Sequence, residues 1–398
     1  MASPVDTSAK FFNENLPDAP VLNGVAGSLI GLLTACLVTG FGLRTAVSLV
    51  VSGGVATLTL ANEAKNANRL HTVVLVEGVT GALTALNGEQ KITFASPTEL
   101  KFATAAADGT ATGAITVKTA PAGWEKKFPG TNTAAFKSLD PTSRGRHLWV
   151  NDSTTIDAKV RGFENMSGVD TGTGPFPTLV ELASGGFWSK SSAANAVANR
   201  WDLFADSWLC YYCPVSFSGA TPSASGQGGY WFGDVLPFKS GDAFATSLSA
   251  ATTAPGGNAG NASVFVSGQA TSTTRYPRSY TGLGSAVSAF AVASAGAGVS
   301  GLDATMGVFP PATDGGLRLT KIHAMEAAAS GASAILRGEM PGVLHSPQTE
   351  LYKSFQRGDT VVFGGRTYYI VQCGGSYGDT PGSPAAGRGF VDITGPWR

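Results

Sequence analysis

The chain is short of charge. Charged residues make up 14% of its 398 residues, whereas an ordinary soluble domain contains about 25%. The 27 basic and 27 acidic side chains cancel and no basic run occurs. A nucleic-acid partner is therefore not expected, because its phosphates require several Lys or Arg. Since hydrophobic residues still make up 43%, the chain can build cores, and we expect other subunits to cover much of its sparsely charged surface.

Cysteine is scarce as well. The four cysteines at 36, 210, 213 and 373 are too few and too scattered for a disulfide framework in a chain of this length. Cys210 and Cys213 are the only closely spaced pair, but in a single strand over 201–215 their odd separation directs them to opposite faces. We therefore predict buried, reduced thiols, no metal and no cofactor, in a protein assembled in a cytoplasm.

A long uninterrupted apolar run is missing too, which disfavours a membrane span. Residues 21–43 are long enough to cross a bilayer, but polar residues and five glycines interrupt the stretch. An apolar stripe at helical spacing instead predicts a short buried helix over about 24–38, after an extended arm at 1–20. Small residues at the spacing that lets helices approach closely, with two leucines, make up the candidate docking and oligomer face: Gly27, Gly31, Ala35, Leu29 and Leu33.

The pattern of short β-strands is what the sequence has in abundance. Glycine pairs at 53–54 and 364–365 separate strand-like runs and predict hairpins at 48–60 and 360–371. Alternating runs between residues 72 and 118 predict a small antiparallel β-barrel or sandwich. We expect a mainly β fold in three parts: an N-terminal attachment arm and buried helix (1–47), the small β-domain (48–125) and a larger β-sandwich-like domain (126–398). A second short helix is predicted at 325–336.

Candidate catalytic motifs are weak. The G-x-S-x-G motif at 374–378 is followed by two prolines instead of a helix. The G-x-G-x-x-G motif at 296–301 lies in a predicted glycine-rich loop. Aromatic residues near three carboxylates, those of Asp202, Asp206 and Asp234, are typical of sugar-binding sites and of glycosidases. Core packing is the favoured interpretation of this region, because aromatic residues dominate the cores of β-rich folds. The possible ligand-facing aromatics are Trp208, Tyr230 and Trp231.

Four short segments are distinctive: PVLNGVAGSLIGLL at 20–33, GVDTGTGPFP at 168–177, RSYTGLG at 278–284 and DITGPW at 392–397. They resemble virion proteins of tailed bacteriophages, of the type encoded among the tail genes of Mu-like phages and prophages. Residues 72–118 are similar to a small β-domain that is common in phage tail proteins and is likened to a catalytic-cysteine half-domain of ubiquitin-activating enzymes. Because residues 72–118 contain no cysteine, the resemblance implies a structural insert without ligase activity.

The resemblance implies a structural, non-enzymatic component of a tail tip or baseplate, which forms a homo-oligomer, expected to be a trimer, and binds other tail proteins. The arm and helix would dock on the tail, so removal of residues 1–40 would leave a soluble β-protein that no longer joins particles. Three alternatives remain open: a tail protein that binds a host surface receptor or glycan, a head decoration protein, and a tail enzyme that degrades polysaccharide.

Overall fold

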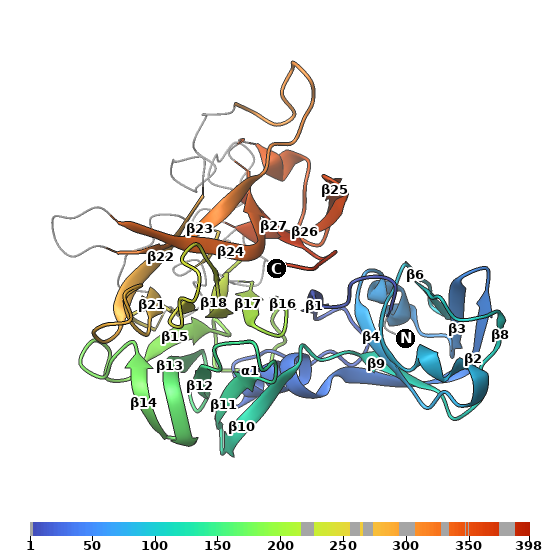
Figure 1. The fold of residues 1–398 in the computed structure, drawn as a ribbon, viewed down its shortest axis with the longest axis horizontal. Helices are drawn as coiled ribbons and strands as arrows, with labels where there is room; N and C mark the ends of the chain where they lie inside the picture. The colour runs from blue at the N-terminus through green and yellow to red at the C-terminus, as the bar shows by residue number, and fades with distance from the viewer. Residues whose placement is uncertain are drawn as a thin grey trace.

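The fold is mainly β, as the sequence predicts. The computed structural model describes residues 3–215, 227–254, 263–265, 274–293, 307–327, 334–346, 348, 350–373 and 387–398. Among these residues the strands form three antiparallel sheets (Figure 1). No helix in the described ranges is long and apolar enough to cross a membrane.

The first sheet is a separate β-unit at one end of the molecule, on the right of Figure 1. Its eight strands run in the order β5-β4-β9-β2-β3-β7-β6, with β8 beside β2. They enclose their own core, which includes Leu58, Val74 and Val117. The strands and short 3-10 turns are β2 (Phe41–Ser52), β3 (Val55–Leu60), η2 (Ala64–Arg69), β4 (Val73–Glu77), η3 (Gly81–Leu86), β5 (Gly88–Lys91), β6 (Phe94–Ala95), β7 (Glu99–Ala103), β8 (Gly109–Thr110) and β9 (Thr116–Thr119).

The predicted hairpin at 48–60 is confirmed. β2 pairs with β3 across Gly53 and Gly54, whose φ angles of 58° and 78° lie in the left-handed region that a two-residue hairpin turn requires. The register shifts between Ala46 and Ser48, so Val47 is an additional residue that bulges from β2.

The second sheet covers one side of the larger body. Its order is β10-β11-β12-β13-β14, with β15 paired to β13. The strands are β10 (Trp124–Gly130), β11 (Thr133–Ser138), β12 (His147–Asn151), β13 (Asp157–Gly168), β14 (Thr171–Phe176) and β15 (Gly186–Ser189).

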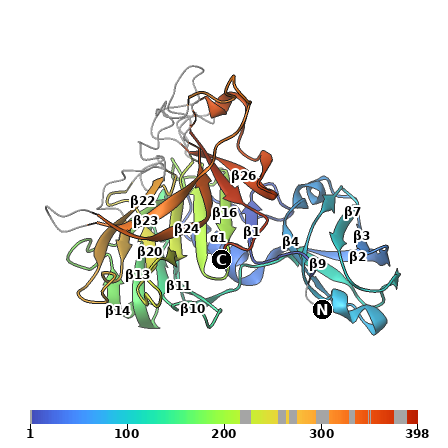
Figure 2. The same ribbon diagram turned by 45° about the horizontal axis from the view of Figure 1, so that its top comes forward.

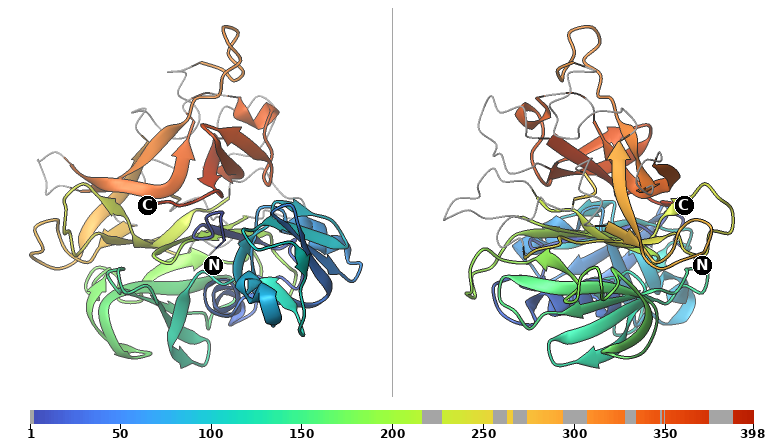
Figure 3. Two further views of the ribbon diagram at one scale, coloured as in Figure 1. Left: turned by 45° about the vertical axis from the view of Figure 1, so that its right-hand side comes forward. Right: turned by 90° about the vertical axis from the view of Figure 1, so that its left-hand side faces the viewer.

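The third sheet has thirteen strands and curls over itself, so that the body has three β-layers (Figure 3). The six-stranded sheet lies below, β16 to β18 lie in the middle, and β22 to β27 lie above. The strands are β1 (Lys10–Asn13), β16 (Trp201–Ala205), β17 (Leu209–Pro214), β18 (Tyr230–Asp234), β19 (Leu236–Pro237), β20 (Thr246–Ser249), β21 (Thr274–Tyr276), β22 (Val287–Ala293), β23 (Thr320–Glu326), β24 (Ile335–His345), β25 (Thr360–Phe363), β26 (Arg366–Cys373) and β27 (Gly387–Asp392).

The middle layer is buried on both faces, which explains its nearly continuous apolar sequence. Cys210 and Tyr212 of β17 face the core against the six-stranded sheet. Tyr211 and Cys213, one residue out of phase, face the core beneath the upper layer. The predicted opposite orientation of the two cysteines is therefore confirmed.

The expected single strand over 201–215 is wrong, because a turn at 206–208 divides it into β16 and β17. The Asp206 carboxylate stabilises that turn by accepting hydrogen bonds from the backbone N–H groups of Trp208, at 2.8 Å, and Leu209, at 2.7 Å. The predicted helix at 325–336 is also wrong at its described ends, since Met325 lies in β23 and Leu336 in β24. The hairpin predicted at 360–371 is confirmed by β25 and β26.

The N-terminal segment is part of the body. β1 pairs with β16 and is wholly buried. The helix predicted over 24–38 is shorter than expected: α1 spans Ser28–Leu33 and continues into the π-helical turn η1 (Thr34–Thr39). Leu29, Leu33 and Cys36 are fully buried in the core between the middle layer and the six-stranded sheet.

Deletion of residues 1–40 is expected to prevent folding, contrary to the expectation from the sequence that the arm is separable. The deletion removes β1 and several fully buried leucines. Each buried leucine contributes about 1.5–3 kcal/mol, and a whole domain is stable by only about 5–15 kcal/mol. Circular dichroism of the purified variant tests this, with deletion of residues 1–5 as the control. A soluble 41–398 protein with a cooperative thermal transition would contradict it.

The chain connects the β-unit to the body, beside which it lies (Figure 2). Buried cations also attach the two parts. The Lys10 ammonium pairs with the Glu89 carboxylate at 3.0 Å. The Lys91 ammonium donates hydrogen bonds to the backbone oxygens of Ala9, at 3.3 Å, and Ile393. Burial lowers the pKa of Lys91 to about 8. Both ends of the chain therefore contact the β-unit.

Candidate functional site

The predicted ligand-facing aromatics do not form one exposed surface. Tyr230 and Trp231 are 0% and 3% exposed, so their assignment as ligand-facing residues is wrong. Tyr230 stacks with Trp188 in one core, and the indole N–H of Trp231 donates to Ser247 Oγ at 2.7 Å. Their alternating positions on β18 place them on opposite faces of the doubly covered middle layer.

Trp208 is half-buried at the turn between β16 and β17. Its indole N–H donates to Asp140 Oδ2 at 2.7 Å, and the Arg398 guanidinium lies 4.6 Å from its ring centroid. This ring thus already has a hydrogen-bond partner and a cation against its face.

The three carboxylates near these aromatics are engaged by arginines. Asp206 pairs with Arg398 at 2.8 Å. Asp234 lies 3.5 Å from Arg144, and Asp202 is fully buried against Arg357. A glycosidase pair presents two carboxyl groups to one sugar, whereas these three are distributed among separate ion pairs. These ion pairs connect separate segments of the chain.

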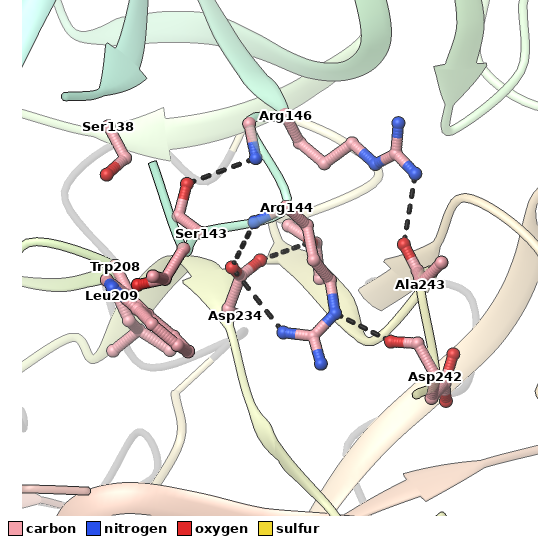
Figure 4. Close-up of polar contacts among 12 residues, drawn as sticks. Ser138, Ser143, Arg144, Arg146, Trp208, Leu209, Asp234, Asp242 and Ala243 are labelled. Atoms are coloured by element: carbon pink, nitrogen blue, oxygen red, sulfur yellow. Dashed lines mark hydrogen bonds and ion pairs between the residues drawn. The ribbon is translucent and has the colours of Figure 1, made fainter. Parts of the chain in front are cut away.

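One link joins the six-stranded sheet to the middle layer (Figure 4). The backbone N–H of Arg144 donates to Asp234 Oδ2 at 2.8 Å, and its guanidinium donates to the backbone oxygen of Asp242 at 2.7 Å. Arg146 donates to the backbone oxygen of Ala243 at 3.0 Å. The segment between β11 and β12 is thereby fixed against β18 and the segment that follows β19.

A second link lies beneath the upper layer. The Arg337 guanidinium of β24 donates to both oxygens of Asp242, at 2.9 and 3.1 Å, and to Glu326 Oε2 at 2.9 Å. The same guanidinium lies 4.0 Å from the centroid of the Tyr276 ring. Burial raises the pKa of Glu326, although Arg337 acts in the opposite direction.

A third link ties the N-terminal segment to the C-terminal strands. Arg357, in the turn before β25, donates to both oxygens of Asp202 and to both oxygens of Glu14, at 2.8 to 2.9 Å. The Tyr369 hydroxyl and the Gln227 amide also donate to Asp202. Burial raises the pKa of Asp202 against the opposing effect of Arg357. Segments 343 residues apart therefore share one buried polar network.

Three of the four thiols are packed inside the protein. Cys36, Cys210 and Cys213 are buried, and burial raises the pKa of Cys210 to about 12. No group of three or more His, Cys, Asp or Glu side chains in the described ranges is placed to hold a metal ion. The G-x-S-x-G and G-x-G-x-x-G spellings at 374–378 and 296–301 lie outside the described residues.

Only part of the predicted docking face of the helix is accessible on the surface. Leu29 and Leu33 are buried in the chain's own core, which removes them from any docking surface. Gly27 precedes the helix with φ 85°, Gly31 is exposed with open space around it, and Ala35 is half-buried.

No local sequence pattern indicates the group that caps this helix. Asp152 Oδ2 accepts the backbone N–H groups of Leu29, at 2.7 Å, and Ile30, at 3.2 Å. The Lys190 ammonium neutralises Asp152 from a third segment. Since the three segments are far apart in sequence, no local capping signal exists.

The outer face of β2 and β3 carries an uncharged surface, which we call the β2–β3 surface. It is formed by Leu43, Thr45, Val47, Val50, Val55 and Thr57. Val47 is 72% exposed and Leu43 58%. The bulge at Val47 keeps residues on both sides of it on this outer face, while Leu49 and Val51 point into the core. Exposed aliphatic residues gathered on neighbouring strands are typical of a contact surface.

No model of a protein family matches this chain, and none of the curated proteins compared with it matches its sequence.

Proposed function

We propose that the protein is a structural component of a bacteriophage tail tip or baseplate, where its copies form a homo-oligomer, expected to be a trimer. The four phage-like segments support the assignment to a virion. The three arginine links support a mechanical role, because they connect the N-terminal segment, the C-terminal strands and the three β-layers of the body.

The β2–β3 surface is the observation that carries the proposal of self-association. Its side chains are aliphatic or hydroxylated, and it belongs to a unit that stands out from the body (Figure 1). Burial of such side chains against another copy contributes about 25 cal/mol per Å² of apolar area. Burial between copies would also explain why the surface of the chain carries few charges.

Val47→Asp is expected to convert the oligomer into a folded monomer. The side chain is largely exposed, so the substitution leaves the core intact, but it places an unpaired charge within the contact. Light scattering after gel filtration measures the mass, and immunogold labelling shows whether the chain is incorporated at the tail end of particles.

Val362→Asp is the matched control, because Val362 is 70% exposed on β25, which belongs to a different sheet from β2 and β3. If Val362→Asp yields monomers and Val47→Asp does not, the contact lies elsewhere. If wild-type protein is monomeric at all concentrations and absent from tails, the proposed function is wrong. Label over the head would favour the head decoration alternative.

A further inference from the structure

The end of the β13–β14 hairpin forms a pocket on the outer face of the six-stranded sheet. Trp149 of β12 is paired with Arg161 of β13, and both face outward because their neighbours Val150 and Val160 point into the core. Phe163 lies on the same face two residues further along β13. With Asp170 and Leu179, these side chains line a hollow of about 260 Å³.

The sequence of the hairpin allows it to bend over Phe163. The register shifts between Met166 and Gly168, which is typical of a bulge that bends a strand. A Cβ atom at Gly172 would lie 2.6 Å from Phe163 Cδ1, so this close approach requires glycine. Asp170 Oδ1 then accepts the indole N–H of Trp149 at 3.2 Å, and this contact holds the rim of the pocket in place.

Arg161 gives the pocket a buried positive charge. The residue is 5% exposed. Its Nη2 donates to the backbone oxygens of Leu182 and, at 3.2 Å, Ala183, but Nε has no hydrogen-bond partner among the described residues. Among the residues that the structure describes, no carboxylate lies within ion-pair distance of Arg161. Arg366, by contrast, pairs with Asp392 in another pocket. Burial lowers the pKa of Arg161 with no anion to oppose it.

Three kinds of ligand group would satisfy these side chains together. Trp149 and Phe163 offer aromatic faces, on which the C–H face of a sugar ring packs. The guanidinium, which no carboxylate among the described residues neutralises, favours a carboxylate through charge-assisted hydrogen bonds. The exposed Asp170 oxygen that does not bind Trp149 accepts a hydroxyl proton. A uronic acid carries all three groups on one ring.

We propose that this pocket binds a carboxylated pyranose, a hexuronate unit of a surface polysaccharide. The sugar ring lies against Trp149, its carboxylate faces Arg161 and a ring hydroxyl donates to Asp170. The site is separate from the β2–β3 surface and goes beyond the proposed role in assembly. Recognition of host polysaccharide would thus occur on the outer layer of the body and not at the aromatics of the middle layer.

Titration of the full-length protein with glucuronic and galacturonic acid, followed by saturation-transfer NMR, tests the proposal. Glucose and galactose are the matched neutral probes. We expect the acids to bind about tenfold more tightly, since a charge-assisted hydrogen bond contributes more than a neutral one. Equal signals from acids and neutral sugars, or no signal from either acid, would overturn the proposal.

Variants locate the site. Trp149→Leu is expected to abolish the transfer signal while the thermal transition stays cooperative, and Trp149→Phe should restore part of it. Phe187→Leu is the control, because Phe187 lies on the same outer face but outside the pocket. Undiminished binding by Trp149→Leu would show that the sugar binds elsewhere and overturn the assignment. The Val47→Asp variant should bind the acids as wild type does, so that the two proposals fail independently.

Discussion

Arg357→Met is expected to lower the free energy of unfolding by about 3–5 kcal/mol, the usual effect of removing one partner from a buried ion pair. Methionine preserves much of the aliphatic volume but leaves Asp202, which is fully buried, and Glu14 without their cation. Urea denaturation followed by tryptophan fluorescence measures the change.

Two further variants separate charge from packing. Arg318→Met removes an exposed guanidinium that pairs with Asp314, and the denaturation midpoint should stay close to that of wild type. The double variant Arg357→Met with Asp202→Asn should regain part of the loss, because the buried side chain is then neutral. If Arg357→Met were as stable as Arg318→Met, the third link would contribute nothing to the fold.

His345→Phe is expected to make the protein more resistant to acid by about 3 kcal/mol at pH 4. His345 is buried at the end of β24, and both ring nitrogens lack hydrogen-bond partners among the described residues. Burial lowers the pKa of His345 to about 4, whereas an unfolded histidine titrates near 6.5. Between these values the unfolded chain binds a proton that the folded chain does not, so stability falls as the pH falls from 6.5 to 4.

The measurement compares wild type and variant by urea denaturation at pH 7 and at about pH 4, where the effect is expected. Other groups titrate in both proteins, so the difference between the two pH dependences isolates His345. Phenylalanine carries no polar atom that burial leaves unsatisfied, and the variant should therefore be at least as stable at pH 7. Parallel loss of stability in both proteins on acidification would show that His345 does not sense the pH change.

The predicted site residues show what a sequence pattern does not determine. Residues 201–215 and 230–232 are apolar at almost every position, and such a run predicts burial but not which face meets which neighbour. The turn at Asp206 reverses the chain, so Leu203 and Leu209, which a single strand over 201–215 would place on one face, lie in two cores. The pocket was missed for a related reason. Trp149 and Asp170 are 21 residues apart, and only the bend at Gly172 brings them together.

The sequence by itself determined the features that depend on neighbouring residues: the mainly β fold, the two glycine-turn hairpins and the opposite faces of Cys210 and Cys213. Each follows from alternating side-chain direction or from a backbone angle that glycine adopts easily. The tertiary structure decided the curl of the thirteen-stranded sheet, the partners of the buried arginines and the lack of a carboxylate partner for Arg161 among the described residues. These depend on contacts such as that between Glu14 and Arg357, 343 residues apart. Charge pairing over such separations has no signature in the local order of residues, because it is set by which layers pack together.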